Sequence, residues 1–288
     1  MKSNLLVCAS GGRTSMYMLD WILANKKDEF NIVAVFANTG WEHPKTLDFV
    51  KRCDEMWQEK YGFSLVWVEA VVHFNQRVAC THKVVTYETA SRKMEPFIEM
   101  CKEYGLPNNG YPHCTRELKE NPIKSYLKSL GWKPGQYQTA LGIRIDEPKR
   151  IKRNKTEQNK VYPLVDWHPE QPEKVDIIQW WEDMPFDLEI PEHLGNCVGC
   201  YKKSEKKLFA AINDARNMFK TDIEKRFGHV GNNKINGELS SQPRTMYRNY
   251  MTNGKLIKLF DSLPKQQNLF KYDDEASEGC SESCEAFV

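Results

Sequence analysis

The stretch CASGGRTSMYM, residues 8–18, decides how the first half of the chain folds. The residues just before its two glycines, 5–9, form a short apolar run that is typical of a buried strand. The glycines permit a turn that a Cβ would obstruct, and residues 16–23 after them predict a helix. A strand, a glycine turn and a helix start together predict an anion site, because free backbone N–H groups and the helix dipole point at the same place.

Strands and helices alternate through the rest of the first half. We predict strands at 31–36, 64–69 and 138–143, and helices at 43–61, 95–103 and 117–130. This alternation predicts an α/β fold, a Rossmann-like doubly wound parallel sheet with helices on both faces. Ligands of such sheets bind beyond the carboxyl ends of the strands, so segments 10–15, 38–42 and 144–147 are expected to line one crevice.

The second half predicts a smaller, mostly helical C-terminal lobe. Helices are expected at 176–182 and 205–219, whereas 226–244 is rich in Gly, Asn, Ser and Gln and is expected to be irregular. The last residues are small and acidic and are expected to be mobile. The predicted organisation is an α/β domain over 1–165, a lobe over 166–272 and an acidic, cysteine-containing tail over 273–288.

Composition sets outer limits on what the protein can be. The chain has 288 residues, of which 40% are hydrophobic, enough for a sizeable core. We find neither a membrane-length apolar run nor a secretion signal, so a cytoplasmic protein that does not enter a membrane is expected. A net charge of +2 neither favours nor excludes nucleic acid as a partner. Nine cysteines in such a chain favour metal or redox sites over a disulfide framework.

One cysteine pattern is typical of a metal site. Cys197 and Cys200 form a Cys-x-x-Cys pair, and Cys114 lies far upstream. Such a set can hold zinc or an iron–sulfur cluster. The alternative is a redox pair or a pair without function.

Two charged segments are candidates for binding anions. Arg116 and Lys119 are three residues apart and share one face if the segment is helical; a solvated helix face is the alternative. In LGIRIDEPKR, residues 141–150, the two arginines can bind anions and the two acidic residues can position a metal or a hydroxyl. The alternative there is a surface turn whose charges pair with one another.

Five motifs, in this order, resemble the phosphoadenosine phosphosulfate (PAPS) reductase-like family of the adenine-nucleotide alpha-hydrolase (PP-loop) superfamily, and its iron–sulfur-containing phage and bacterial members in particular. The motifs are SGGRTS at 10–15, FANTGWEHP at 36–44, HCTRELKENPI at 113–123, LGIRIDEPKR at 141–150 and CVGC at 197–200. That superfamily includes sulfonucleotide reductases, ATP sulfurylases and tRNA thiolases.

The resemblance implies that the glycine turn cradles the phosphates of ATP or another adenine nucleotide, such as PAPS or adenylyl sulfate. It also implies that the segment after the second strand, 38–42, lies near the adenosine. Thr14 replaces the family's usual acidic residue, and Arg13 is expected to clamp a phosphate or sulfate with its planar fork. Mg²⁺ is expected at the two acidic residues of the fourth motif. The residues expected to bind the nucleotide are Ser10, Gly11, Gly12, Arg13, Thr14, Ser15, Asn38, Thr39, Gly40, Glu42, Gly142, Arg144, Asp146, Glu147 and Arg150.

The resemblance also implies a [4Fe-4S] cluster held by Cys114, Cys197 and Cys200. His113 stands where the family carries the first cysteine of a pair, so the fourth ligand is either His113 or an external group, such as sulfide, on an open iron. The family implies that Arg116 and Lys119 act catalytically at the phosphate or sulfate end of the nucleotide.

The acidic tail adds two further candidate catalytic residues. Cys280 or Cys284 suits a tail nucleophile of the kind that sulfonucleotide reductases use, although the family's usual tail motif is missing. A resolving pair, a metal-sensing pair or a disordered end is the alternative.

These implications predict an enzyme of sulfur transfer or sulfonucleotide chemistry, either an ATP-dependent thiolase or a reductase of PAPS or adenylyl sulfate. The expected partners are a tRNA or DNA acceptor, an electron or sulfur donor protein and a second copy of the chain. The alternative is a non-catalytic, nucleotide-responsive binding or regulatory module with a structural cluster or zinc. In that case the lobe contacts nucleic acid through Lys225, Arg226, Lys234, Arg244 and Arg248.

Overall fold

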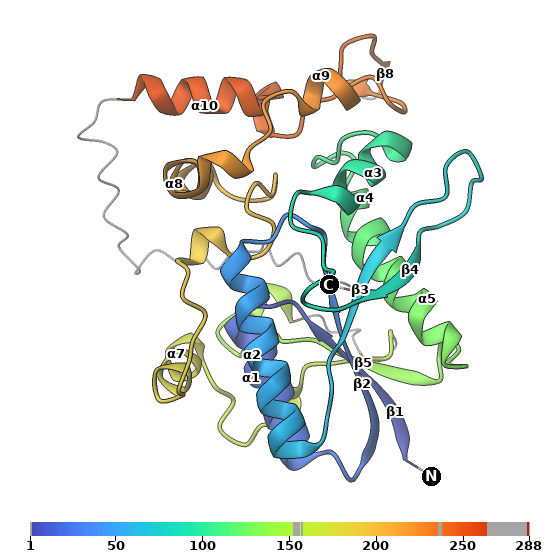
Figure 1. The fold of residues 1–288 in the computed structure, drawn as a ribbon, viewed down its shortest axis with the longest axis vertical. Coiled ribbons are helices and arrows are strands. Elements are labelled where there is room, and N and C mark those ends of the chain that lie inside the picture. The colour runs from blue at the N-terminus through green and yellow to red at the C-terminus, as the bar shows by residue number, and fades with distance from the viewer. Residues whose placement is uncertain (1, 152–155, 157, 236–237, 264–286, 288) are drawn as a thin grey trace.

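A six-stranded sheet forms the centre of the computed structural model, which describes residues 2–151, 156, 158–235, 238–263 and 287. The strand order is β4-β3-β2-β1-β5-β6 (Figure 1). All neighbouring strands run parallel except β4, which is antiparallel to β3. The strands are β1 (Ser3–Ala9), β2 (Phe30–Ala37), β3 (Val66–Val71), β4 (Thr81–Val85), β5 (Tyr137–Ala140) and β6 (Lys160–Val161). The predicted α/β, Rossmann-like fold is confirmed.

Helices cover both faces of the sheet. Along β1, Leu5 and Val7 belong to one apolar core and Leu6 to another, because successive side chains of a strand point to opposite faces. The first core is shared with α1 (Arg13–Asn25) and α2 (Pro44–Tyr61), and the second with α5 (Asn121–Ser129). Two further helices, α6 (Pro163–Asp166) and α7 (Lys174–Glu182), pack against α1.

The predicted helix over 117–130 is present, but its first turn is not a regular α-helix. A short helix, α4 (His113–Thr115), leads into a π-helical turn, Arg116–Glu120, and only then does α5 begin. Pro122 has no N–H, so a regular α-helix would leave the carbonyl of residue 118 without its partner. The Asn121 N–H instead reaches back five residues, to the carbonyl of Arg116.

The predicted strands need two corrections. β4 was not predicted, and it pairs with β3 as the second strand of a hairpin. The predicted strand over 138–143 ends at Ala140, and the Ile143 N–H turns back to the carbonyl of Leu141. That turn directs the residues after it across the carboxyl end of β1.

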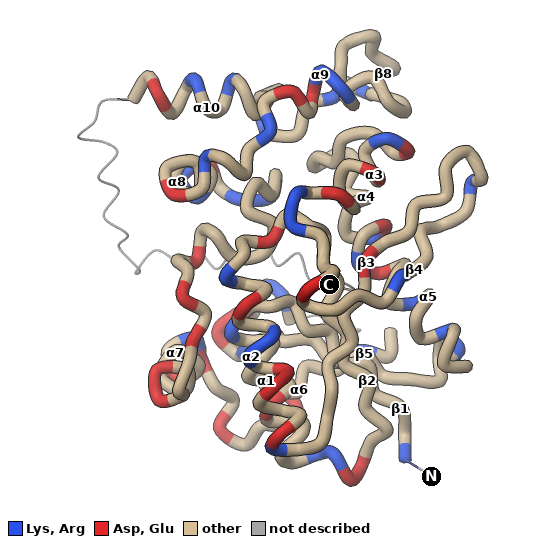
Figure 2. Tube along the Cα trace, viewed as in Figure 1, with Lys and Arg blue, Asp and Glu red and all other residues tan. Residues whose placement is uncertain are grey.

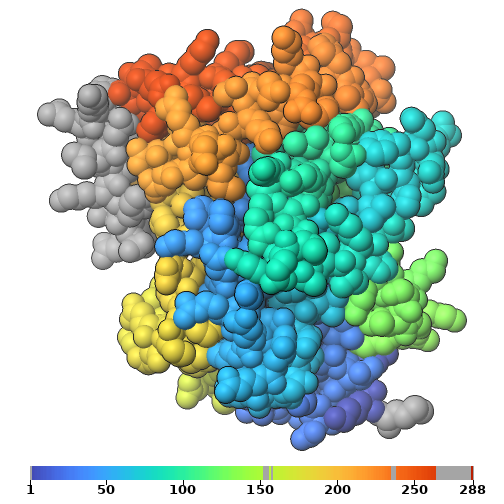
Figure 3. Space-filling model, viewed as in Figure 1, coloured from blue at the N-terminus to red at the C-terminus, as the bar shows by residue number. Residues whose placement is uncertain are grey.

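The part of the chain from α8 (Glu205–Ala215) onward packs onto the upper end of the α/β part, as Figure 3 shows. It contains α8, α9 (Ile223–Phe227) and α10 (Asn253–Ser262), the last not predicted, and the hairpin of β7 (Lys234–Ile235) with β8 (Glu238–Leu239). The predicted helix over 205–219 is shorter than expected, since α8 gives way to a 3₁₀ turn at Arg216–Met218. Close by in the α/β part lies α3 (Glu95–Tyr104).

One hydrophobic core extends from β1 through Trp41 to Phe260 of α10. It therefore crosses the position near residue 165 where the sequence predicts a domain boundary. That boundary stays a prediction. Positive and negative residues alternate over the described trace of both halves (Figure 2). Within the described part of the chain, we find no helix with the length and apolar character that a bilayer span requires.

Candidate functional site

The loop that joins β1 to α1 is closed by its own serines. The Ser15 hydroxyl accepts a hydrogen bond from the Ser10 N–H at 3.0 Å and donates to the carbonyl of Gly12 at 3.1 Å. Gly11 has a φ of +79°, and a Cβ there would lie 2.9 Å from a methyl of Thr46. Glycine is therefore required at Gly11, and the loop has the compact shape predicted from residues 8–18.

The segment after β5 lies directly against this loop. A Cβ on Gly142 would lie 3.1 Å from the Cα of Ser15, so only glycine permits the close approach. Arg144 donates from Nη1 to the Thr14 hydroxyl at 3.1 Å, which ties the two segments together. Because β1 and β5 are neighbours and the chain leaves β1 toward β2 on the other side, this is the switch point of the sheet.

The acidic residues of this segment are engaged by its arginines. Asp146 accepts two hydrogen bonds from Arg144, at 2.8 and 3.1 Å. Glu147 accepts the Arg144 N–H at 3.1 Å and pairs with the guanidinium of Arg150. A cation at these carboxylates would compete with both arginines.

Arg13 is also engaged within the protein. Its guanidinium donates to both carboxylate oxygens of Asp187, at 2.7 and 2.6 Å, and to the carbonyl of Leu188 at 2.5 Å. The fork that the sequence assigned to a phosphate therefore connects α1 to the segment after α7. A phosphate would have to displace Asp187 to reach it.

The segment after β2 is rigid and buried. Asn38 donates to a carboxylate oxygen of Glu69 at 2.6 Å, and its own side-chain oxygen accepts the Gly40 N–H at 3.1 Å. The carboxylate of Glu42 accepts the Thr39 hydroxyl at 2.8 Å and the N–H groups of Thr39 and Trp41, each at 3.1 Å. Asn38 and Glu42 therefore hold the shape of this segment.

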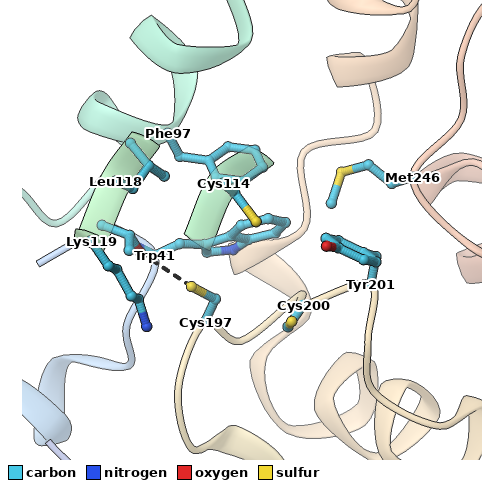
Figure 4. Close-up of a pocket in the computed structure, with 10 residues that line it drawn as sticks. Trp41, Phe97, Cys114, Leu118, Lys119, Cys197, Cys200, Tyr201 and Met246 are labelled. Carbon is cyan, nitrogen blue, oxygen red and sulfur yellow. Dashed lines mark hydrogen bonds between the residues drawn. The ribbon is translucent and has the colours of Figure 1, made fainter. Parts of the chain in front are cut away.

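The same segment forms one wall of a pocket that contains all three predicted cysteine ligands (Figure 4). Cys114 comes from α4, whereas Cys197 and Cys200 come from the loop before α8. The pocket is partly open to solvent. Its lining residues are Thr39, Trp41, Phe97, Cys114, Leu118, Lys119, Cys197, Cys200, Tyr201 and Met246.

Polar groups surround Cys197 in this pocket. Its sulfur lies 3.2 Å from the Thr39 hydroxyl and 3.9 Å from a carboxylate oxygen of Glu42. Burial raises the pKa of Glu42, and the nearby ammonium of Lys119 acts in the opposite direction. Lys119 lies in the pocket wall, where it supplies a positive charge, and the catalytic role expected for it stays a prediction.

His113 and Arg116 lie outside the lining of the pocket. The Nε2 of His113 is 3.0 Å from the carbonyl of Gly105, and burial lowers the pKa of this imidazole to about 4. Arg116 is exposed and donates to Glu117 at 2.7 Å. Among the described residues, no three His, Cys, Asp or Glu side chains converge on a point where one metal ion would bind. The thiols instead line the wall of the pocket.

Sequence reasoning missed the residues that shape the pocket by packing. A Cβ on Gly199 would lie 2.3 Å from the indole of Trp41, so the glycine of the Cys-x-x-Cys loop makes room for that ring. The Trp41 indole N–H donates to the carbonyl of Met218 at 2.9 Å. Gly199 could have indicated a close contact from the sequence alone. Nothing in the local sequence around Tyr201 or Met246 indicates that these residues line a pocket.

The remaining sequence candidates fall in the tail and the lobe. Cys280 and Cys284 lie outside the described residues. At the end of the chain, the Phe287 N–H donates to Glu120 at 3.4 Å, and the Lys124 ammonium lies 5.1 Å from the centre of its ring. The last described residue therefore lies at the start of α5.

Of the lobe cations considered for nucleic acid, Arg244 is buried and donates to the carbonyls of Tyr104 and Leu106. Its place is structural, because it joins the lobe to the end of α3. The other four are exposed: Lys225, Arg226, Lys234 and Arg248.

Comparison with known proteins agrees with this architecture. Residues 4–175 match the model of the phosphoadenosine phosphosulfate reductase domain. The chain is 35% identical to the uncharacterized nin region protein ORF290 of Escherichia phage lambda, over 98% of this chain and 94% of that protein. It is also 24% identical to an uncharacterized protein of Methanocaldococcus jannaschii, over 67% of this chain and 39% of that protein. The chain belongs to the phosphoadenosine phosphosulfate reductase domain family.

Proposed function

We propose that this protein is an adenine-nucleotide-binding iron–sulfur enzyme of sulfur transfer or sulfonucleotide chemistry. The family supports nucleotide-related sulfur chemistry, and the finer assignment rests on one observation. Cys114, which is far upstream in the sequence, lines the same pocket as the pair Cys197 and Cys200. Thiolates are the usual protein ligands of iron–sulfur clusters, so the donor set suits such a cluster.

The surroundings of the thiols fit a negatively charged group. Lys119 lies buried in the pocket wall with Glu42 as a charged neighbour, and it supplies a positive charge beside the thiols. The Thr39 hydroxyl lies 3.2 Å from Cys197, and it would have to turn from Glu42 to donate to a thiolate sulfur there. Such contacts tune the potential of a cluster.

The nucleotide is proposed to bind at the carboxyl ends of β1, β2 and β5. The loop of residues 10–15 offers a glycine turn at the start of α1, which suits phosphate oxygens. Thr39 belongs both to the predicted adenosine segment and to the wall of the cysteine pocket. A nucleotide on the loop and a cluster in the pocket would therefore share the segment after β2.

Two reactions suit this arrangement. In a thiolation, an oxygen of the acceptor attacks the α-phosphate of ATP and pyrophosphate leaves. Hydrosulfide from a sulfur donor then attacks the activated carbon, and the bond from that carbon to the oxygen of AMP breaks. In a reduction, a thiolate attacks the sulfur of PAPS or adenylyl sulfate, the bond between that sulfur and the nucleotide oxygen breaks, and a dithiol donor then releases sulfite. An assay for pyrophosphate and one for sulfite separate the two.

The assignment is tested by measuring iron and acid-labile sulfide in protein purified without oxygen. We expect about four irons and four sulfides per chain, as in a cubane cluster. Cys197→Ala should lose most of both. Cys101→Ala is the matched control, because Cys101 is equally buried but lies outside the pocket lining, and it should keep the full content. Zinc in place of iron, or equal iron in both variants, would contradict the proposal.

A further inference from the structure

The carbonyl groups between the two cysteines of the Cys-x-x-Cys loop are both held by buried side chains. The carbonyl of Val198 accepts from the Lys203 ammonium at 2.9 Å. The carbonyl of Gly199 accepts from the Tyr247 hydroxyl at 3.1 Å. On the amide side, the Val198 N–H donates to the carbonyl of Trp41 at 3.0 Å. The loop is therefore fixed from three directions.

Lys203 braces the loop from the side of α8. It is only 5% exposed, and it also donates to the carbonyl of His193 at 2.7 Å. These two bonds join the residues before the cysteine pair to the residues within it. A buried ammonium group needs compensating partners, and the two carbonyls are among them. Lys203 therefore brings a positive charge to the back of the Cys-x-x-Cys loop.

Tyr247 holds the loop from the side of the lobe. Its hydroxyl lies 3.1 Å from the carbonyl of Gly199 and 2.9 Å from the side-chain oxygen of Asn253. One hydroxyl proton cannot serve both acceptors, and the Asn253 amide nitrogen has no partner among the described residues. Turning the amide over lets that nitrogen donate to Tyr247, which then donates to Gly199. Burial raises the pKa of Tyr247 well above its ordinary value, so the hydroxyl keeps its proton.

We propose that Lys203 and Tyr247 are positioning residues for Cys197 and Cys200, and that Lys203 in addition supplies a buried positive charge behind the cluster. This inference rests on the proposed function. Hydrogen bonds outside the ligands hold them in place, and net charge near a cluster sets its reduction potential. Reduction adds an electron, so a buried cation makes it more favourable. Lys203 is therefore expected to affect the reduction potential of the cluster, whereas Tyr247 is not.

The test compares Lys203→Met, Tyr247→Phe and Lys202→Met in the full chain, purified without oxygen. Lys202 is the neighbouring lysine and is more exposed, so it is the matched control. Two properties are measured in each variant. The first is the midpoint potential of the cluster. The second is the rate at which iodoacetamide alkylates Cys197 and Cys200 in the presence of a chelator, located by peptide mass spectrometry, with the buried Cys53 as an internal measure of global unfolding.

Both Lys203→Met and Tyr247→Phe should raise the alkylation rate of the pair severalfold while leaving Cys53 unchanged. Lys203→Met alone should also move the midpoint to a clearly more negative value. If Lys203→Met and Tyr247→Phe both behave as Lys202→Met does, the proposal is overturned. If Lys203→Met fails to fold, Tyr247→Phe still tests the positioning role through the alkylation rate.

The alkylation rates separate this inference from the proposed function. Iron in the unmodified protein tests the cluster, whereas the alkylation rates test the fixing of the loop whichever metal is present. A protein without iron whose loop is loosened by Tyr247→Phe would contradict the cluster and keep the positioning role. A protein with iron whose variants show no change would support the cluster and contradict the positioning role.

Discussion

The loop that joins β1 to α1 and the cysteine pocket are built in opposite ways. The loop consists of neighbouring residues, 10–15, and its serines close it with bonds to one another. The pocket takes its walls from the segment after β2, from α4 with the π-turn, and from the loop before α8. The first site is local to a stretch of sequence, and the second exists only when the lobe packs on the α/β part. The second should therefore be far more sensitive to changes in packing.

The largest effect is expected at the contact between the two halves. Gly199→Ala would place a Cβ 2.3 Å from the Trp41 indole, so the ring or the loop must move. Over-packing of this kind costs about 1–3 kcal/mol, and we expect most of the iron to be lost with it. Iron content and thermal unfolding measure the two effects.

Gly254→Ala is the control for that change. Gly254 lies in α10, and its nearest neighbour would be 3.9 Å from the new Cβ. Alanine is favoured over glycine in helices, so this variant should keep its iron and gain up to about 1 kcal/mol. Equal iron in the two variants would show that the close contact does not shape the pocket.

The next effect concerns activity alone. Arg116 is exposed and pairs with Glu117, so Arg116→Ala should leave the fold and the iron unchanged. If its guanidinium binds the sulfate or phosphate end of the nucleotide, kcat/KM should fall about 10- to 150-fold, the worth of a charged hydrogen bond of about 1.5–3 kcal/mol. Lys128→Ala, at the exposed end of α5, is the matched control. A variant with full activity would remove Arg116 from the reaction, and the absence of turnover in the unmodified protein would favour a binding module.

A smaller effect should appear in the pH dependence of stability. Burial raises the pKa of Glu224 in the lobe to about 7. The folded state then holds a proton more tightly than the unfolded state, so this group destabilises the fold increasingly as the pH rises from about 5 to about 8. Glu224→Gln should remove that component, which is on the order of 1–3 kcal/mol. Urea unfolding of the unmodified protein and of Glu224→Gln, each at about pH 5 and about pH 8, measures this component. An equal loss of stability between the two pH values in both proteins would contradict the assignment.

The smallest effect is expected at the local loop. Arg13 is held by Asp187 and Leu188, and we expect Arg13→Lys to weaken ATP binding less than threefold. Calorimetry measures the affinity. A loss of tenfold or more would mean that the guanidinium leaves Asp187 for a phosphate, as the motif first indicated.

The contrast between the two sites also explains what sequence could predict. The strand, turn and helix around Gly11 and Gly12 follow from local patterns, and so does the alternation that leads to the parallel sheet. The π-turn at Arg116–Glu120 was missed because it keeps the helical pattern of its side chains while shifting the backbone bonds. Cys114, Cys197 and Cys200 were grouped through family resemblance. Trp41 and Met246 reach the pocket, and Tyr247 reaches the Cys-x-x-Cys loop, only through packing between distant segments, for which no local pattern exists.

The measurement that tests the central claim most directly is whether a nucleotide changes the cluster. Electron paramagnetic resonance spectra of the reduced protein would be recorded with and without ATP, adenylyl sulfate or PAPS. Because Thr39 lies in the pocket wall and in the predicted adenosine segment, we predict that at least one nucleotide alters the signal, and that Arg144→Met weakens this response. Identical spectra with all three, under conditions where calorimetry shows a nucleotide bound, would contradict a single composite site.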